Sequence, residues 1–123
     1  MNFEEILLRY ILPLLFVGLG LPLYYEKIKP NMIYGFRITL FVLQNKEAWY
    51  AVNKQGGKDF IIIGLLALIL GSTMQTFEEA AMYVSIMIAI GSIISIVRAY
   101  VLAFGMKKKI TQTEAAQGND QNQ

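Results

Sequence analysis

The 123-residue sequence contains no cysteine and no histidine. Without cysteine it can form neither a disulfide nor a thiolate metal site, and without histidine it lacks the commonest neutral metal ligand and the usual general base. Its central part also holds no close pair of carboxylates and no metal-ligand spacing, so we expect a chain that is not an enzyme and binds no metal or cofactor. Charge is scarce as well: 16% charged against 55% hydrophobic residues is typical of the membrane class, and we expect no nucleic-acid partner.

Long apolar runs take the place of the missing polar residues. Residues 6–25 are apolar except for Arg9, and a helix of that length rises about 30 Å, the thickness of the bilayer hydrocarbon core. The residues before this run are acidic and no A-x-A-like cleavage site follows it, which favours a retained span over a signal peptide. Further spans are predicted over 60–77 and 80–104. The fold class is therefore an all-α integral membrane protein with three transmembrane helices, and 1–105 is its membrane domain.

Small residues recur along one face of each of the last two spans. In the second span they are Gly64, Ala67 and Gly71, and in the third they are Ala81, Ser85, Ala89, Ser92, Ala99 and Ala103. Small side chains let helix backbones approach closely in a membrane, where lipid supplies no hydrophobic drive. The two stripes predict that the second and third spans form a tightly packed hairpin.

Residues 29–58, between the first two spans, are polar, basic and rich in aromatics. The apolar run at 38–43 is too short to cross a bilayer, so we expect it in the interface or against the spans. Asn45 is placed as the N-cap of a short amphipathic cytoplasmic helix over 46–55, and Gly56 with Gly57 as its C-cap and the turn into the next span. After the third span, residues 106–123 are rich in Gln, Asn, Thr and Ala and are predicted to be a disordered cytoplasmic tail.

The basic residues predict the orientation of the chain. Nine of them flank the spans on one side: Lys27, Lys29, Arg37, Lys46, Lys54, Lys58, Lys107, Lys108 and Lys109. The turn between the second and third spans has none. Because cytoplasmic loops carry the excess of Lys and Arg, we expect residues 29–58 and the C-terminus in the cytoplasm and the N-terminus outside.

A set of residues in 29–58 carries a resemblance to a known family. They are Pro30 and Asn31; Gly35, Phe36 and Arg37; Trp49; Asn53 and Lys54; and Gly57 and Lys58, followed at once by an apolar span. In this arrangement the chain resembles the SdpI-type membrane immunity proteins over residues 29–72. The resemblance implies a bacterial inner-membrane protein. It also implies a function in protecting a toxin producer from its own membrane-active peptide, in some cases while holding a transcription repressor at the membrane.

The candidate partner- or lipid-binding residues are Asn31, Gly35, Phe36, Arg37, Trp49, Asn53, Lys54 and Lys58. The Arg37 guanidinium could clamp a carboxylate or lipid phosphate, or it could extend to the headgroups or pair with Glu26 or Glu47. Trp49 is either a recognition anchor or an interfacial tryptophan. For Asn31 and Asn53 a structural role, hydrogen bonding to irregular backbone, competes with a binding role, and Gly35 suits a turn or close packing.

Arg98 lies inside the third span, where a charge is a functional hypothesis by default. We predict that it pairs with Glu26 at the end of the first span. The leading functional hypothesis is a small SdpI-like protein that binds a partner or confers tolerance to a membrane-active peptide, with Arg37→Ala expected to abolish protection. The alternative is an accessory subunit of a larger membrane or transport complex. The expected partners are the bilayer, a peptide toxin, a regulator or a larger complex, and the chain could also form a homo-oligomer.

Overall fold

The computed structural model describes residues 1–36 and 40–121, and within these residues the regular secondary structure is entirely helical. The elements are α1 (Phe3–Ile6), the π-helical segment η1 (Leu7–Ile11), α2 (Leu12–Tyr24), α3 (Leu40–Gln44), α4 (Lys46–Thr73) and α5 (Phe77–Gln121). The first three follow one another without a break and form one rod. This rod, α4 and α5 are the 3 helices long and apolar enough to cross a membrane, which confirms the all-α, three-span fold class.

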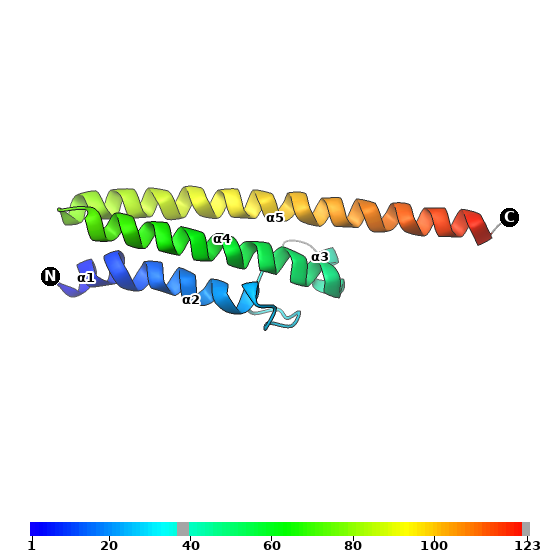
Figure 1. Cartoon of the computed structure of the whole chain (residues 1–123), viewed down its shortest axis with the longest axis horizontal. Helices are drawn as coiled ribbons and strands as arrows, with labels where there is room; N and C mark the ends of the chain where they lie inside the picture. The colour runs from blue at the N-terminus through cyan, green and yellow to red at the C-terminus, as the bar shows by residue number, and fades with distance from the viewer. Residues whose placement is uncertain (37–39, 122–123) are drawn as a thin grey trace.

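The three rods lie side by side (Figure 1). The N-terminus and the connection between α4 and α5 lie at one end of the bundle, called here the turn end. The segment between α2 and α3 lies at the other, called the loop end. A helix of 28 residues such as α4 rises about 42 Å, which exceeds the roughly 30 Å of a hydrocarbon core. Its polar N-terminal half at the loop end therefore extends beyond the apolar part of the bundle.

Helix α4 is longer than the sequence predicts. The N-cap at Asn45 is confirmed, because its side-chain oxygen accepts a hydrogen bond of 3.0 Å from the amide of Ala48. The predicted turn at Gly56 and Gly57 is wrong, because both glycines are buried inside one continuous helix. Gly56 faces the ring of Phe36 and Gly57 faces the backbone of α2, so these glycines permit close packing instead of ending the helix.

The small residues of α4 also have a different partner from the predicted one. A Cβ on Gly64 would lie 2.6 Å from the carbonyl oxygen of Pro13, and a Cβ on Gly71 would lie 2.9 Å from that of Arg9. These glycines therefore face the first rod, and the prediction that they face the third span is wrong. Gly57, Gly64 and Gly71 follow one another at intervals of seven residues, and this spacing keeps them on one helical face.

Helix α5 packs against the rest of the bundle through a stripe that overlaps the predicted one only in part. Its buried residues include Ala80, Val84, Ser95, Ala99 and Ala103. Of the predicted stripe, Ala99 and Ala103 are buried, whereas Ser85 and Ala89 are exposed. The contact face of α5 thus contains small residues, but it is rotated in part from the predicted stripe and also includes the larger Val84.

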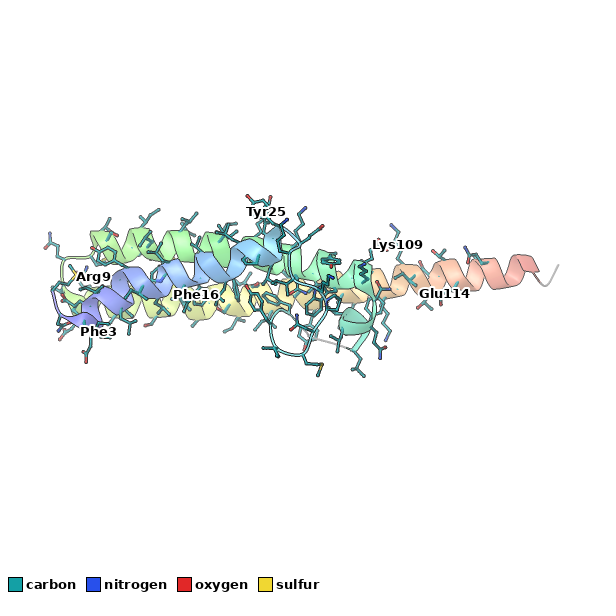
Figure 2. The ribbon with its side chains drawn as sticks, turned by 90° about the horizontal axis from the view of Figure 1, so that it is seen from below. Phe3, Arg9, Phe16, Tyr25, Lys109 and Glu114 are labelled. Atoms are coloured by element: carbon teal, nitrogen blue, oxygen red, sulfur yellow. The ribbon has the colours of Figure 1, made fainter. Side chains whose placement is uncertain are left out.

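The C-terminal part of α5 differs from the disordered tail that the sequence predicts. The helix continues through Gln121, beyond the other two rods, and carries Lys109 and Glu114 on its projecting part (Figure 2). Near the bundle it is not isolated: Met106 and Ile110 line a hollow together with Glu47 of α4. Ala, Glu and Gln are good helix formers, so the polar segment extends a helix that is already nucleated. Residues 122–123 of the predicted tail lie outside the described residues.

Candidate functional site

The candidate site is built at the loop end, where residues 29–36 fold over α4. Asn31 shapes the segment: its Oδ1 accepts hydrogen bonds from the amides of Ile33 (2.8 Å) and Tyr34 (2.7 Å), and its Nδ2 donates to the carbonyl of Lys29 (2.7 Å). Asparagine favours such turns because its short side chain can bond to nearby backbone. The turn directs Met32 and Ile33 outward, with 67% and 91% of their surface exposed.

Asn53 of α4 joins this segment to the helix. Its side chain is 2% exposed; Oδ1 accepts from the amide of Phe36 (2.5 Å), and Nδ2 donates to the carbonyls of Trp49 (2.9 Å) and Phe36 (3.4 Å). Gly35, the residue before Phe36, has a φ of +117°, and a Cβ there would lie 2.8 Å from Oδ1 of Asn53. Asn31 and Asn53 therefore have the structural role considered for them, and Gly35 is required by both its backbone angle and its space.

Two aromatic side chains complete the contact between loop and helix. Trp49 is fully buried, and its indole nitrogen donates to the carbonyl of Ile28 at 2.8 Å. The ring of Phe36 packs over Gly56, where a Cβ would lie 2.2 Å from it, and its centroid lies 5.3 Å from that of Phe60. Trp49 thus anchors the loop from inside, and it presents no surface to a partner.

The side chain of Tyr34 also forms a long-range contact. Its hydroxyl donates to the carbonyl of Leu19 in α2, so the loop is tied to the first rod as well as to α4. Burial raises the pKa of Tyr34 above its usual value of 10.0, because desolvation disfavours the phenolate. The neutral phenol therefore keeps its donated bond throughout the physiological range.

Two of the predicted site residues remain exposed. Lys54 and Lys58 lie on the outer face of α4, and the Lys54 ammonium lies 5.6 Å from the centroid of the Tyr24 ring. Together with Arg98 they line a hollow of about 450 Å³ between α2, α4 and α5. Of the predicted site, the structure thus brings Gly35 and Phe36, both partly buried, against the buried Trp49 and Asn53. Asn31 shapes the adjoining turn, and the two lysines lie outside this cluster. Arg37 lies outside the described residues.

Arg98 has a different partner from the predicted one. Its Nη1 donates to Oδ1 of Asp59 in α4, and the pair joins α4 to α5. The predicted pairing with Glu26 is wrong: Glu26 is exposed, with a φ of 58° in the turn that ends α2. The sequence does not indicate Asp59 as the partner, because a predicted turn at Gly56 and Gly57 leaves the orientation of the next residues undefined.

The second residue that sequence reasoning missed is Arg9, at the turn end. It is 5% exposed, and its Nη1 donates to the carbonyls of Gly71 (2.7 Å) and Met74 (2.6 Å), where α4 ends. The last carbonyls of a helix lack partners within the helix and carry partial negative charge, so a guanidinium suits this position. Figure 2 shows Arg9 near the same end of the first rod as Phe3. The available signal was a single charge inside an apolar run, which needs a buried partner.

The described residues hold no group of three or more carboxylate, histidine or cysteine side chains that could bind a metal ion. The cluster around Asn53 and Trp49 is instead a fixed support. It holds the loop 29–36 against two helices and leaves a small apolar tip and a basic hollow at the surface.

Comparison with known proteins identifies the family of this arrangement. The SdpI/YfhL protein family matches residues 27–99, which contain the loop, α3, the whole of α4 and the α5 segment packed on it. Neither the curated proteins nor the solved structures contain a match to the chain. Since the matched residues make up more than half of the 123-residue sequence, the chain belongs to the SdpI/YfhL protein family.

Proposed function

We propose that this chain is a multi-pass protein of the bacterial cytoplasmic membrane that binds a partner and so confers tolerance to a membrane-active peptide. The observation that carries the proposal is the family match over residues 27–99, which spans every residue of the buried Asn53 and Trp49 cluster. The role proposed is one of binding without catalysis, because the chain lacks histidine and cysteine and its site is held by hydrogen bonds and packing.

The proposed orientation has the N-terminus outside and the loop end in the cytoplasm. Lys46, Lys54 and Lys58 of α4 and Lys107 to Lys109 of α5 lie toward the loop end, whereas the turn between α4 and α5 has no basic residue (Figure 1). A C-terminal green fluorescent protein fusion should fluoresce and a C-terminal alkaline phosphatase fusion should be inactive. The reverse pattern would contradict the orientation.

We place the partner surface at the exposed tip of the loop. Met32 and Ile33 are apolar, largely exposed and held by the Asn31 turn, and exposed apolar side chains on a fixed support suit recognition of an apolar peptide or helix.

The test is survival of a susceptible bacterium that expresses the protein during challenge with a panel of membrane-active peptides. The inhibitory concentration should rise with the wild-type protein. It should return to the baseline with Met32→Ser/Ile33→Ser, and also with Arg37→Ala. Leu40→Ser is the matched control, since Leu40 is 72% exposed at the same end but outside the loop, and it should still protect. Absence of protection by the wild type against every peptide would overturn the proposed function; protection by the loop variant would overturn only the proposed surface.

The second candidate function, an accessory subunit of a larger membrane or transport complex, is favoured by one observation. Ser85 and Ala89 of α5 are exposed, so a small-residue strip is free to accept another helix. Purification from the native membrane in mild detergent should then yield a stoichiometric partner, or a homo-oligomer. Recovery as a monomer would rule out this candidate.

A further inference from the structure

We infer that the space between α4 and α5 at the loop end is a binding site for one phospholipid with an anionic headgroup. The inference goes beyond the proposed function, since it requires neither a peptide nor a protein partner. It rests on two adjoining spaces of opposite character: the basic hollow beside Lys54, Lys58 and Arg98, and an apolar groove that continues from it toward the turn end.

The hollow suits a phosphate. Its lining residues are Tyr24, Ala51, Lys54, Gln55, Lys58 and Arg98, which include three cations and no carboxylate. The guanidinium of Arg98 uses Nη1 for Asp59, and the side chain stays 49% exposed, so part of the group is accessible from the hollow. Even with Asp59 counted, the three cations exceed the one nearby carboxylate and leave positive charge for a phosphodiester.

The groove suits an acyl chain. It has a volume of about 370 Å³. The pair Asp59 and Arg98 lies at its mouth together with Ser95, and its other walls are apolar. The wall residues are Ile62, Ile63 and Leu66 of α4 and Met87, Ile90, Gly91, Ile94 and Ser95 of α5. Ile90 and Ile94 are 54% and 53% exposed, so the groove opens along its side to the surroundings of the bundle, where a chain could enter from the bilayer.

The two spaces follow one another along a single face of α4. Ala51, Lys54 and Lys58 line the hollow, and Asp59, Ile62 and Leu66 line the groove, at successive turns of the helix. On α5 the groove runs from Arg98 to Met87, a rise of about 16 Å, which is close to the roughly 15 Å that one leaflet contributes to the hydrocarbon core. Cations at the helix end outside the core, followed by apolar walls inside it, repeat the order of headgroup and chain in a phospholipid.

The junction of the two spaces holds buried polar atoms without a partner. Within the described residues, Oδ2 of Asp59 and Oγ of Ser95 have no hydrogen bond, although these residues are only 6% and 2% exposed. Buried polar groups in native proteins are nearly always hydrogen-bonded, so both atoms indicate a polar occupant at this depth. An ester carbonyl, which lies between headgroup and chain, is an acceptor for the Ser95 hydroxyl, and a headgroup hydroxyl is a donor for Asp59.

The first experiment compares headgroups. Delipidated protein in a mild detergent is titrated with dioleoyl phosphatidylglycerol or dioleoyl phosphatidylcholine, and thermal unfolding is followed by the fluorescence of Trp49, the single tryptophan. Phosphatidylglycerol should raise the midpoint at a roughly thirtyfold lower mole fraction than phosphatidylcholine, given about 1 kcal/mol for each of the two cations in excess of the Asp59 carboxylate. Equal effects of the two lipids, or the same shift with inorganic phosphate alone, would overturn the inference.

The second experiment locates the headgroup. Lys54→Gln/Lys58→Gln should abolish the preference for phosphatidylglycerol. Lys27→Gln/Lys108→Gln removes the same charge from two exposed lysines that do not line the hollow, and it should leave the preference intact. An equal loss in both double variants would mean that diffuse surface charge attracts the lipid, and the assigned site would be wrong.

The third experiment locates the chain. Ile94→Trp should fill the groove and reduce the phosphatidylglycerol retained in native mass spectrometry, whereas Ile93→Trp, its neighbour with 62% exposure outside the groove, should retain it. Equal retention by both variants would overturn the groove as the chain site. A dimer that forms in place of lipid binding and is lost in Ile94→Trp would show that a second copy of the chain, and no phospholipid, occupies the groove.

Discussion

Gly20 of α2 and Gly57 of α4 lie against each other's backbone. A Cβ on Gly20 would lie 2.5 Å from the carbonyl oxygen of Gly57, and a Cβ on Gly57 would lie 2.6 Å from that of Gly20. The relationship is reciprocal, so both residues must lack a side chain for the two helices to approach this closely. This contact lies near the end of α2. It fixes the separation of α2 and α4 at the point where the chain leaves α2 for the loop 29–36.

We predict that Gly57→Ala destabilises the protein. The added methyl group would meet the Gly20 oxygen and the Tyr24 nitrogen, both at 2.6 Å, and backbone atoms in two helices cannot move away as a flexible side chain can. Overpacking of this kind costs about 1–3 kcal/mol, which exceeds the gain of up to about 1 kcal/mol from replacing glycine in a helix. The measurement is the unfolding midpoint in detergent, followed by Trp49 fluorescence.

Gly18→Ala and Gly105→Ala are the matched controls for this prediction. Both residues are helical, and a Cβ on either meets nothing within 4 Å. Each substitution should therefore raise the midpoint slightly, since alanine is the better helix former. A rise for Gly57→Ala as well would show that α2 and α4 can separate at little cost.

The second prediction is that Asn53→Leu releases the loop. Leucine preserves the approximate size of the side chain but leaves the amide of Phe36 without its acceptor and the carbonyl of Trp49 without its side-chain donor. An unsatisfied buried backbone group costs about 1–3 kcal/mol. We expect faster chymotryptic cleavage after Tyr34, within the loop, and a red shift in the emission of Trp49.

Asn45→Ala separates release of the loop from general loss of stability. It removes the N-cap bond to Ala48, which costs about 1 kcal/mol, but it touches no residue of the loop. Chymotryptic cleavage after Tyr34 should therefore stay close to the wild-type rate. If both variants accelerate cleavage equally, Asn53 has no specific role in holding the loop.

The parts of the fold that the sequence predicts are those set by local pattern. Apolar runs of sufficient length predict three spans, and a polar residue before a helix, such as Asn45, predicts its N-cap. Glycine is ambiguous at the same level. At Gly56 and Gly57 it could end a helix or admit a neighbour, and the outcome depends on Phe36 and α2, which are distant in sequence.

The choice of partner is the part that local pattern cannot supply. The sequence predicts Glu26 as the partner of Arg98, whereas the structure pairs Arg98 with Asp59. Asp59 faces α5 because α4 continues without a turn through the preceding glycines. For the candidate site, the sequence predicts the residue types but not their burial. Trp49 and Asn53 are buried and Lys54 is exposed, because the glycine contacts with α2 fix the rotation of α4 about its axis.

The third prediction concerns Arg9 at the turn end. Arg9→Met should lower stability by about 2 kcal/mol, because the carbonyls of Gly71 and Met74 lose their charged donor. Arg9→Lys keeps the charge but has a single ammonium in place of the fork, so it should fall between the wild type and Arg9→Met. Hydrogen exchange should also increase in the turn between α4 and α5. Unchanged exchange and an unchanged midpoint in Arg9→Met would show that the end of α4 needs no cap.

The fourth prediction is that Asp59 and Arg98 are energetically coupled. Arg98→Gln leaves the Asp59 carboxylate, 6% exposed, without its cation, and we expect a loss of about 2 kcal/mol, a value lowered for the partial exposure of the arginine. In Asp59→Asn/Arg98→Gln the charge that would be left unpaired is absent, so the double variant should lose less than the sum of the single variants. The measurements are made without added phospholipid, which keeps the coupling separate from lipid binding.

Glu26→Gln, at the exposed carboxylate, is the control. It should change stability by no more than about 0.5 kcal/mol, and its effect should add simply to that of Arg98→Gln. Coupling of Arg98 to Glu26 with additivity toward Asp59 would contradict the ion pair and the packing of α4 on α5 that produces it.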